Sequence, residues 1–414
     1  MHGKLVVGFV MVAALGGCAR SAPSLVPAPV AAAPGVDVLL TDSLTLVRGR
    51  RVGLVTNQAG VDARGVGDVE RLRAAGIDLV ALFSPEHGFR GTAAPGEEVA
   101  STRDSATGLP IYSLYGRTRV PTASMLDQLD VILVDLQDAG ARYFTYLATT
   151  VDVMRGAARA DKPVVILDRP DPIGGAVQGN VLDTAYASDV GLLAVPMRPG
   201  MTLGELARLA RSDLKLTADL SVIPVRGWQR DQPFDATGLP FVPPSPNLPT
   251  LESLFHYPGL CLFEGTDLSV GRGSDAPFEQ VGAPWLDTAR VLARVRGAKL
   301  PGVAFRGVTF TPERPGDGKY ADTLLRGIRL TVIDRSTYDP TATAVYLLAA
   351  IRAVHPRQFE FADAQFDRLA GGRDLREALQ RGEGAGRIVR GWAPARAAFL
   401  RRRAPFLLYP AAAH

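Results

Sequence analysis

The stretch "DVILVDLQD", residues 130–138, indicates the fold class of this 414-residue chain. Its residues 131–134 are all apolar, and polar side chains follow at Asp135, Gln137 and Asp138. Because successive side chains of a strand point to opposite faces, an unbroken apolar run predicts a strand that is buried on both faces. Such strands are typical of parallel sheets that helices cover on each side. The same pattern, an apolar run that ends in polar side chains, recurs at residues 51–57, 78–87 and 163–171.

Helical patterns alternate with these strands. Residues 66–75, 145–160 and 202–214 fit helices, and Thr202 stands three residues before Glu205, the spacing of a capping box. Alternation of strands and helices predicts an α/β fold with a Rossmann-like, doubly wound parallel sheet. In such sheets, ligands bind outside the carboxyl ends of the strands. We therefore expect the polar side chains that follow the strands to converge at one edge of the sheet.

A second, smaller α+β unit is expected after the sheet. Residues 229–290 are rich in Pro and Gly, which predicts a long loop region; its Phe, Leu, Trp and Tyr residues indicate that the loops are ordered. Beyond this region, the patterns fit two strands and a helix, at residues 303–312, 325–334 and 340–354. We expect the first unit to span residues 36–288 and the second to span residues 289–414.

The N-terminus has the pattern of an exported chain. Its apolar residues 5–15 number only 11, too few to cross a bilayer as a helix and typical of a signal peptide core. Two glycines and Cys18 follow, which resembles the bacterial lipoprotein cleavage pattern; an ordinary signal peptide with an incidental Cys is the alternative. We expect a lipoprotein signal peptide over residues 1–18, lipidation of Cys18, and an Ala/Pro-rich tether over residues 19–35. Ala19, in place of an Asp, favours the periplasmic face of the outer membrane if the source is Gram-negative.

Composition argues against several classes of protein. Charged residues make up 21% of the chain and hydrophobic residues 47%, with a formal net charge of +4, which fits a globular protein. No run of basic residues alternates with aromatic ones, so we expect no nucleic acid partner. The glycine patterns of dinucleotide and ATP sites are absent. Because the chain has 5 His and 2 Cys in all, we expect neither a metal site nor a cofactor.

The strand expected at residues 78–85 is followed by Glu86 and His87, within the stretch "LFSPEHGFRG". A carboxyl group beside apolar side chains such as those of Phe83 and Phe89 can act as a general acid. His87 would then bind a substrate or orient Glu86. The alternative is a polar turn with both side chains in water. Since the stretch follows a strand of the expected sheet, Glu86 is our first candidate catalytic residue.

A second candidate stretch is "DLQDAGARYFTY", residues 135–146. Arg142 can bind a carboxylate in fork geometry, and the tyrosines offer apolar faces with a hydroxyl group, which suits sugars. The alternative is that Asp138 caps the following helix and that the aromatic side chains belong to the core. The candidate substrate-binding residues in this stretch and elsewhere are Asn57, His87, Asp135, Gln137, Arg142, Tyr143, Tyr146, Arg169, Asn247 and Arg272.

Several long stretches occur in the order found in a known family. They are "GLVTNQAGVD", "LFSPEHGFRG", "DLQDAGARYFTY", "LDRPDPIGG", "PMRPGMTLGELA", "FVPPSPNLPTLESLFHYPG", "FEGTDLSVGRGSDAPFE" and a C-terminal "FDRLAGGRDLREAL" with "GWAPARAAFLRRRAPFLLY". Over roughly residues 36–409, the chain closely resembles the bacterial exo-β-N-acetylmuramidase family, long filed as a domain of unknown function. The resemblance implies a Rossmann-like catalytic domain, residues 36–288, and an auxiliary C-terminal domain. It also implies release of N-acetylmuramic acid from the non-reducing ends of peptidoglycan fragments, with the catalytic glutamate at Glu86.

This chemistry assigns further roles. A glycosidase usually needs a second carboxylate as nucleophile or base; Glu264 is the first candidate, before Asp138 and Asp135, and attack by the acetamido group of the substrate is a further possibility. The lactyl carboxylate of muramic acid would be bound by one of three arginines, Arg142, Arg90 or Arg272. The expected partners are a peptidoglycan-derived saccharide and, through the lipid, a membrane. The alternatives are a non-enzymatic envelope lipoprotein that binds muropeptides or sugars, and a hydrolase of another acidic saccharide or ester.

Overall fold

The computed structural model describes residues 1–5, 8, 32–94 and 96–410. Cys18 and most of the expected signal peptide and tether, residues 6–7 and 9–31, lie outside the described residues. No helix in the described part of the chain is long and apolar enough to cross a membrane. The described residues from Ala32 to Pro410 belong to one compact unit by their contacts, and the following description concerns this unit. The division expected at residue 288 stays a prediction.

A seven-stranded sheet, in the order β3-β4-β2-β1-β5-β6-β9, forms the centre of the first half of the described chain. All neighbouring strands are parallel except β3, which is antiparallel to β4. Counted along the chain, the parallel strands have the order 3-2-1-4-5-6 of a Rossmann fold, which confirms the predicted fold class. The strands are β1 (Arg51–Thr56), β2 (Asp78–Ser84), β3 (Thr102–Arg103), β4 (Pro110–Ser113), β5 (Val131–Asp135), β6 (Val164–Leu167) and β9 (Leu220–Ile223).

Helices cover both faces of this sheet, as the unbroken apolar runs predict. Leu133 and Val134, neighbours in β5, are both fully buried but belong to different hydrophobic clusters. One cluster contains side chains of α1 (Gly35–Asp42) and α2 (Asp68–Ala74), and the other contains side chains of α3 (Ala123–Leu126), α4 (Tyr146–Arg159) and α5 (Leu203–Asp213). Full burial of a Leu or Val side chain contributes about 1.5–3 kcal/mol, so these two clusters favour this arrangement over an exposed sheet.

The register of the sheet brings the ends of the strands together. Thr56 at the end of β1 is paired with Asp135 at the end of β5. Ser84 at the end of β2 is paired with Ser113 at the end of β4. Residues that directly follow these four strands therefore emerge at the same edge of the sheet, as predicted.

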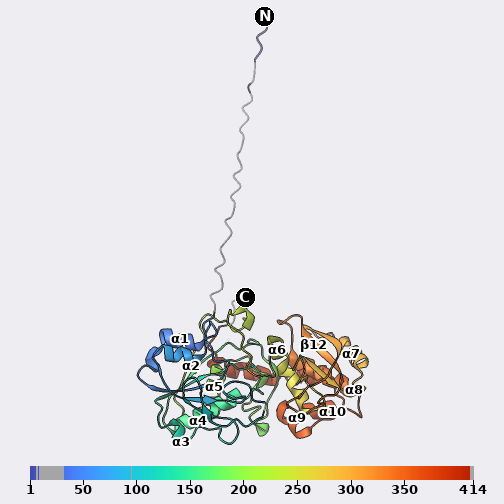
Figure 1. Ribbon diagram of the computed structural model, residues 1–414. Coiled ribbons are helices and arrows are strands. Elements are labelled where there is room, and N and C mark those ends of the chain that lie inside the picture. Colours follow the sequence, from blue (N-terminus) through green and yellow to red (C-terminus); the bar gives the residue numbers. More distant parts are fainter. Residues whose placement is uncertain (6–7, 9–31, 95, 411–414) are drawn as a thin grey trace. The chain divides into compact units, whose positions relative to one another are not determined.

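The second half of the chain is a smaller α+β part, drawn in yellow to red in Figure 1. Its antiparallel sheet has the strand order β10-β12-β11, and its apolar side chains continue one of the two clusters of the first half. The strands here and in the small hairpin that precedes them are β7 (Gln178–Val181), β8 (Pro196–Arg198), β10 (Gln280–Ala283), β11 (Val303–Phe310) and β12 (Leu325–Val332). The helices are α6 (Leu251–Leu260), α7 (Thr288–Gly297), α8 (Pro340–Val354), α9 (Asp363–Ala370), α10 (Asp374–Gln380), α11 (Ala385–Gly391) and α12 (Ala393–Arg403).

The long loop region expected at residues 229–290 is wrong in part, because it contains α6 and β10. Thr250 caps α6 in a capping box with Ser253, although Ser does not have the Glu or Gln side chain that is usual at this position. Pro258 lies inside the helix and removes one backbone donor. The helix forms nonetheless because most of its residues are buried between the two halves' apolar side chains.

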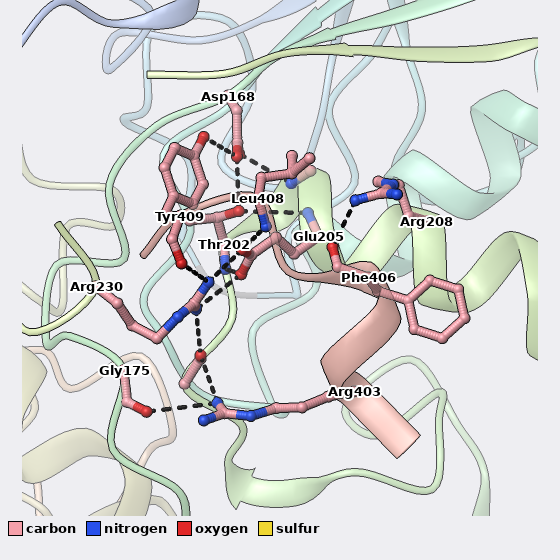
Figure 2. A network of polar contacts seen from close by, with 12 residues as sticks. Asp168, Gly175, Thr202, Glu205, Arg208, Arg230, Arg403, Phe406, Leu408 and Tyr409 are labelled. Atoms are coloured by element: carbon pink, nitrogen blue, oxygen red, sulfur yellow. Dashed lines mark hydrogen bonds and ion pairs between the residues drawn. The ribbon is translucent and has the colours of Figure 1, made fainter. Parts of the chain in front are cut away.

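The chain ends by returning to the first half, where residues 404–410 form what we call the C-terminal strap (Figure 2). The hydroxyl of Tyr409 donates to Asp168 Oδ2 at 2.6 Å, and the amide of Leu408 donates to Glu205 Oε1 at 2.7 Å. Arg230 forms an ion pair with Glu205 and donates to the carbonyl oxygen of Tyr409 at 3.1 Å. Glu205 also completes the predicted capping box with Thr202. The strap thus joins a buried polar network of the Rossmann-like part.

Candidate functional site

A cavity of about 280 Å³ opens at the edge of the sheet where β2 and β4 end. It is at the small end of the range for ligand pockets, about 300–1,000 Å³, which suits a single sugar unit. Both halves of the chain contribute to it. The lining residues are Glu86, His87, Tyr115, Arg119, Tyr143, Phe144, Thr145, Ser188, Asp189, Val190, Ser245, Asn247, Leu248, Tyr257, Cys261, Glu264, Arg272, Phe278, Arg368 and Leu369.

Glu86 follows β2 by two residues and is half-buried in this cavity. Its Oε2 accepts a hydrogen bond from Thr145 Oγ1 at 2.7 Å, and its Oε1 accepts one from the amide of Gly96 at 3.1 Å. Thr145 is the residue that precedes α4, so the carboxyl group also lies near the positive end of a helix. No Lys, Arg or His of the described chain forms an ion pair with Glu86. The carboxyl group is therefore held in place at both oxygens while it faces the cavity.

Tyr115 is a second acid–base group next to Glu86. Burial raises the pKa of the Tyr115 hydroxyl to about 12, and the neighbouring carboxylate of Glu86 contributes to the same shift. At neutral pH the hydroxyl therefore keeps its proton. It can donate a hydrogen bond to Glu86 or to a ligand in the cavity.

His87 fixes the turn that carries Glu86. It has a left-handed backbone with φ of 68°, followed by Gly88 with φ of 74°. Its Nδ1 lies 2.9 Å from the carbonyl oxygen of Ala93, which can only accept, so Nδ1 carries the proton. Its Nε2 then accepts from Ser245 Oγ at 3.0 Å. The imidazole joins the turn after β2 to the Pro-rich segment around Ser245 and so orients Glu86.

Glu264 is a further carboxylate of the cavity, besides Glu86 and Asp189, and it comes from the other half of the chain. It lies in a short 3-10 turn, Cys261–Gly265, and its Oε1 accepts from Arg272 Nε at 2.7 Å. The guanidinium of Arg272 is 5.0 Å from the centre of the Phe278 ring. Lys319 secures the turn, because its ammonium donates to the carbonyl oxygens of Glu264, Thr266 and Leu268 at 2.6–3.1 Å.

Six of the predicted site residues come together around this cavity. They are Glu86, His87, Tyr143, Asn247, Glu264 and Arg272. The other predicted residues of the described chain, which do not line the cavity, are Asn57, Arg90, Asp135, Gln137, Asp138, Arg142, Tyr146 and Arg169.

Asp135 and Arg169 belong to a buried ion pair behind the edge of the sheet. Arg169 also donates to the carbonyl oxygen of Val61 at 2.7 Å. Burial raises the pKa of Asp135 and of its neighbour Asp68, which lies 3.9 Å from the Arg169 guanidinium. This cluster stabilises the ends of β1, β5 and β6 and is closed to a ligand of the cavity.

Asp138 and Gln137 organise the backbone after β5. Asp138 Oδ1 accepts from the amide of Gly140 at 2.8 Å, and burial raises the pKa of Asp138 to about 7. Asp138 does not cap the following helix, which was the alternative to a role in the site, since α4 begins several residues later, at Tyr146. Gln137 Nε2 donates to the carbonyl oxygens of Asp138 and Pro170, both at 3.0 Å.

Arg142, Tyr146, Asn57 and Arg90 hold loops together. The buried guanidinium of Arg142 donates to the carbonyl oxygens of Asn180, Val195 and Leu369 at 2.8–3.2 Å. Asn57 Nδ2 donates to the Tyr146 hydroxyl at 2.6 Å, and that hydroxyl donates to the carbonyl oxygen of Pro244 at 2.9 Å. Arg90 is exposed and forms an ion pair with Asp104 at 3.3 Å.

Several residues that line the cavity were not among the predicted site residues. Tyr115 and Thr145 had a usable signal, because the first follows a predicted strand and the second lies inside the "DLQDAGARYFTY" stretch. The remaining ones stand in loops or on short helices, and those that lie in the quoted family stretches, such as Ser245, Tyr257 and Arg368, were not singled out there. They include Arg119, Asp189, Ser245, Tyr257 and Arg368.

Two other observations concern ligands. Among the described residues, no group of three or more His, Cys, Asp or Glu side chains is arranged to hold a metal ion. A larger groove of about 940 Å³ lies between η2 (Thr184–Tyr186) and the helices α10, α11 and α12. Its charged side chains include both arginines and carboxylates, and two of them, Arg381 and Glu383, form an ion pair with each other. We therefore take the cavity around Glu86 as the candidate active site.

Comparison with known proteins concerns the family of the chain. Residues 52–252 match the family described as exo-beta-N-acetylmuramidase NamZ, N-terminal, and residues 255–409 match its C-terminal counterpart. The peptidoglycan beta-N-acetylmuramidase NamZ of Bacillus subtilis (strain 168) is 41% identical over 378 residues, which cover 91% of each chain. Two DUF1343 family crystal structures from Bacteroides fragilis NCTC 9343 are also similar. One has a TM-score of 0.84 at 32% identity, covering 91% of this chain and 99% of that one; the other has 0.73 at 30%, covering 92% and 99%.

Proposed function

Because the chain belongs to the exo-β-N-acetylmuramidase NamZ family and is thus a glycoside hydrolase, we propose that Glu86 is its catalytic acid/base. The proposed reaction is release of N-acetylmuramic acid from the non-reducing ends of peptidoglycan fragments. The observation that carries this proposal is the position of the Glu86 carboxyl group. It faces the cavity at the sheet edge, fixed by Thr145 and Gly96.

Cleavage of a glycosidic bond needs a proton for the leaving oxygen. Glu86 supplies it and then takes a proton from the attacking water. Glu264 is the second catalytic carboxylate of the proposal, because it lines the same cavity whereas Asp135 and Asp138 do not. Its ion pair with Arg272 fixes it where it can stabilise positive charge on the sugar ring or direct a water molecule. Attack by the acetamido group of the substrate remains compatible with Glu86 as the acid.

The substitution Glu86→Gln tests the assignment. Loss of a general acid typically lowers the rate about 100- to 10,000-fold, so we expect a chromogenic N-acetylmuramide to be cleaved at least about 100-fold more slowly. The matched control is Glu70→Gln, on the exposed face of α2, which should keep wild-type turnover. Wild-type turnover in Glu86→Gln would refute the assignment. If the wild-type chain binds a muramic acid–glucosamine disaccharide without cleaving it, that result would favour the non-enzymatic alternative.

We further propose that the protein is a periplasmic lipoprotein, anchored at Cys18 to the outer membrane. The support is the order of an apolar core, two glycines and a Cys in the N-terminal sequence. In cells fed with labelled palmitate, the wild-type protein should carry the label and sediment with membranes. Cys18→Ala should carry no label, and label on that variant would contradict the proposal.

A further inference from the structure

Three arginines line the cavity, and they differ in their partners. Arg119 forms an ion pair with Asp189 at 2.5 Å, and Arg272 forms one with Glu264 at 2.7 Å. Arg368 is exposed and has no ion pair or side-chain hydrogen bond with any described residue. It is therefore the cavity arginine whose charge is left for a ligand.

The backbone that carries Arg368 is fixed by other residues. Arg368 lies in the last turn of α9, which ends at Gly371 with φ of 71°. The carbonyl groups at this helix end carry partial negative charge, and other side chains already satisfy them. Arg142 Nη2 donates to Leu369 O at 3.0 Å, and Asn180 Nδ2 donates to Ala370 O at 2.7 Å. The guanidinium of Arg368 is thus not needed to cap its own helix.

The carboxylates of the cavity have other partners, so none of them pairs with the guanidinium of Arg368. Asp189 and Glu264 are engaged by Arg119 and Arg272, and Glu86 is held by Thr145 and Gly96. A neutral sugar would leave Arg368 without a counter-charge. A sugar with a carboxylate supplies one, in the bidentate geometry that arginine favours.

We infer that Arg368 binds the carboxylate of the lactyl ether that distinguishes muramic acid from glucosamine, and so sets the selectivity of the cavity. This inference rests on the proposed function. Arg368 takes the role that the sequence suggested for Arg142, Arg90 or Arg272. Arg142 and Arg90 do not line the cavity, and Arg272 is paired with Glu264. The C-terminal half of the chain then supplies substrate selectivity, while the Rossmann-like half supplies the acid.

The experiment compares Arg368→Ala with the wild type on chromogenic glycosides. Arg368→Ala removes hydrogen bonds between two charged groups, which are stronger than those between neutral groups. We therefore expect kcat/KM for the N-acetylmuramide to fall about 10- to 100-fold, mainly through KM. The slower cleavage of the N-acetylglucosaminide should not change. A substrate with the lactyl carboxylate methylated should be equally poor for both proteins. Arg368→Lys should restore part of the loss, and Arg357→Ala, an exposed arginine outside the cavity, should have no effect.

Two results would overturn the inference. One is an unchanged preference for the N-acetylmuramide in Arg368→Ala. The other is an equal loss on the methylated substrate, which would show a role independent of the carboxylate. Titration of free N-acetylmuramic acid by calorimetry gives a readout that needs no cleavage, and Arg368→Ala should bind it more weakly. If the wild type cleaves no muramide, the proposed function fails, and the titration still decides the role of Arg368.

Discussion

Glu86 and Asp138 both follow strands at the same sheet edge, but their surroundings give them different roles. Glu86 faces the cavity and is half-buried. Asp138 is buried behind it, and this burial raises its pKa to about 7. The carboxyl group of Asp171 is in a similar state, with its pKa raised by burial to about 7. Folding therefore favours the protonated form of Asp138 and Asp171.

This leads to a prediction about stability and pH. An Asp in the unfolded chain has its ordinary pKa of about 3.9, so between about pH 4 and pH 7 the folded protein binds more protons than the unfolded one. The contribution of Asp138 and Asp171 to the free energy of unfolding should therefore fall as pH rises through this range. Asp138→Asn should reduce the change in the free energy of unfolding between pH 4 and pH 7 by an amount on the order of a few kcal/mol. Urea unfolding at pH 4, 5.5 and 7 measures it.

The matched control for that experiment is Asp127→Asn, an exposed residue after α3, which should leave the slope unchanged. Since the amide of Asn can still accept from Gly140, the turn after β5 should survive the substitution. Identical slopes in the wild type and Asp138→Asn would contradict the prediction.

At the scale of elements, the sequence predicted the sheet well and the cavity only in part. The strands β1, β2, β5 and β6 were predictable because each is apolar on both faces and ends in polar residues. The helix α6 was missed, because Pro258 and the neighbouring Pro and Gly residues suggested loops. The local sequence pattern determines these strands, whereas burial against the rest of the chain determines α6.

The site residues divide in the same way. Glu86 follows a predicted strand, so its place at the sheet edge could be derived from the sequence. Arg368 reaches the cavity only because Arg142 and Asn180 hold the end of α9, and Gly265 packs against Phe366. Such contacts join residues far apart in the chain, and no local pattern reports them. Arg142 was noticed for its charge, but it acts as a support for the helix that carries Arg368.

The C-terminal strap gives a prediction at this scale. Tyr409→Phe removes the hydrogen bond to Asp168 and leaves the amide of Val225 without its acceptor at 3.0 Å. An unpaired buried donor costs about 1–3 kcal/mol, so urea unfolding should show a loss of that size. Turnover of the folded variant should not change, because the strap does not line the cavity. Tyr186→Phe, a half-buried tyrosine in another segment, is the control; equal stability of the two variants would contradict the prediction.

At the scale of the whole molecule, the candidate site is shared between the two halves. The acid comes from the Rossmann-like half, and Glu264, Arg272 and Arg368 come from the α+β half. The same hydrophobic cluster also runs through both halves. The α+β part is therefore more than an accessory, because it supplies one wall of the cavity.

The return of the last residues to the first half has a consequence for synthesis (Figure 1). Glu205 and Asp168 are buried acids whose partners include Leu408 and Tyr409. A chain leaving the ribosome, or emerging from a translocation pore, makes these partners last. Until then these two acids lack the hydrogen bonds from Leu408 and Tyr409, although Arg230 and Thr202 of the same half already bind them. We therefore expect the buried polar network of the Rossmann-like half to be completed only after the last residues have left the ribosome or the pore.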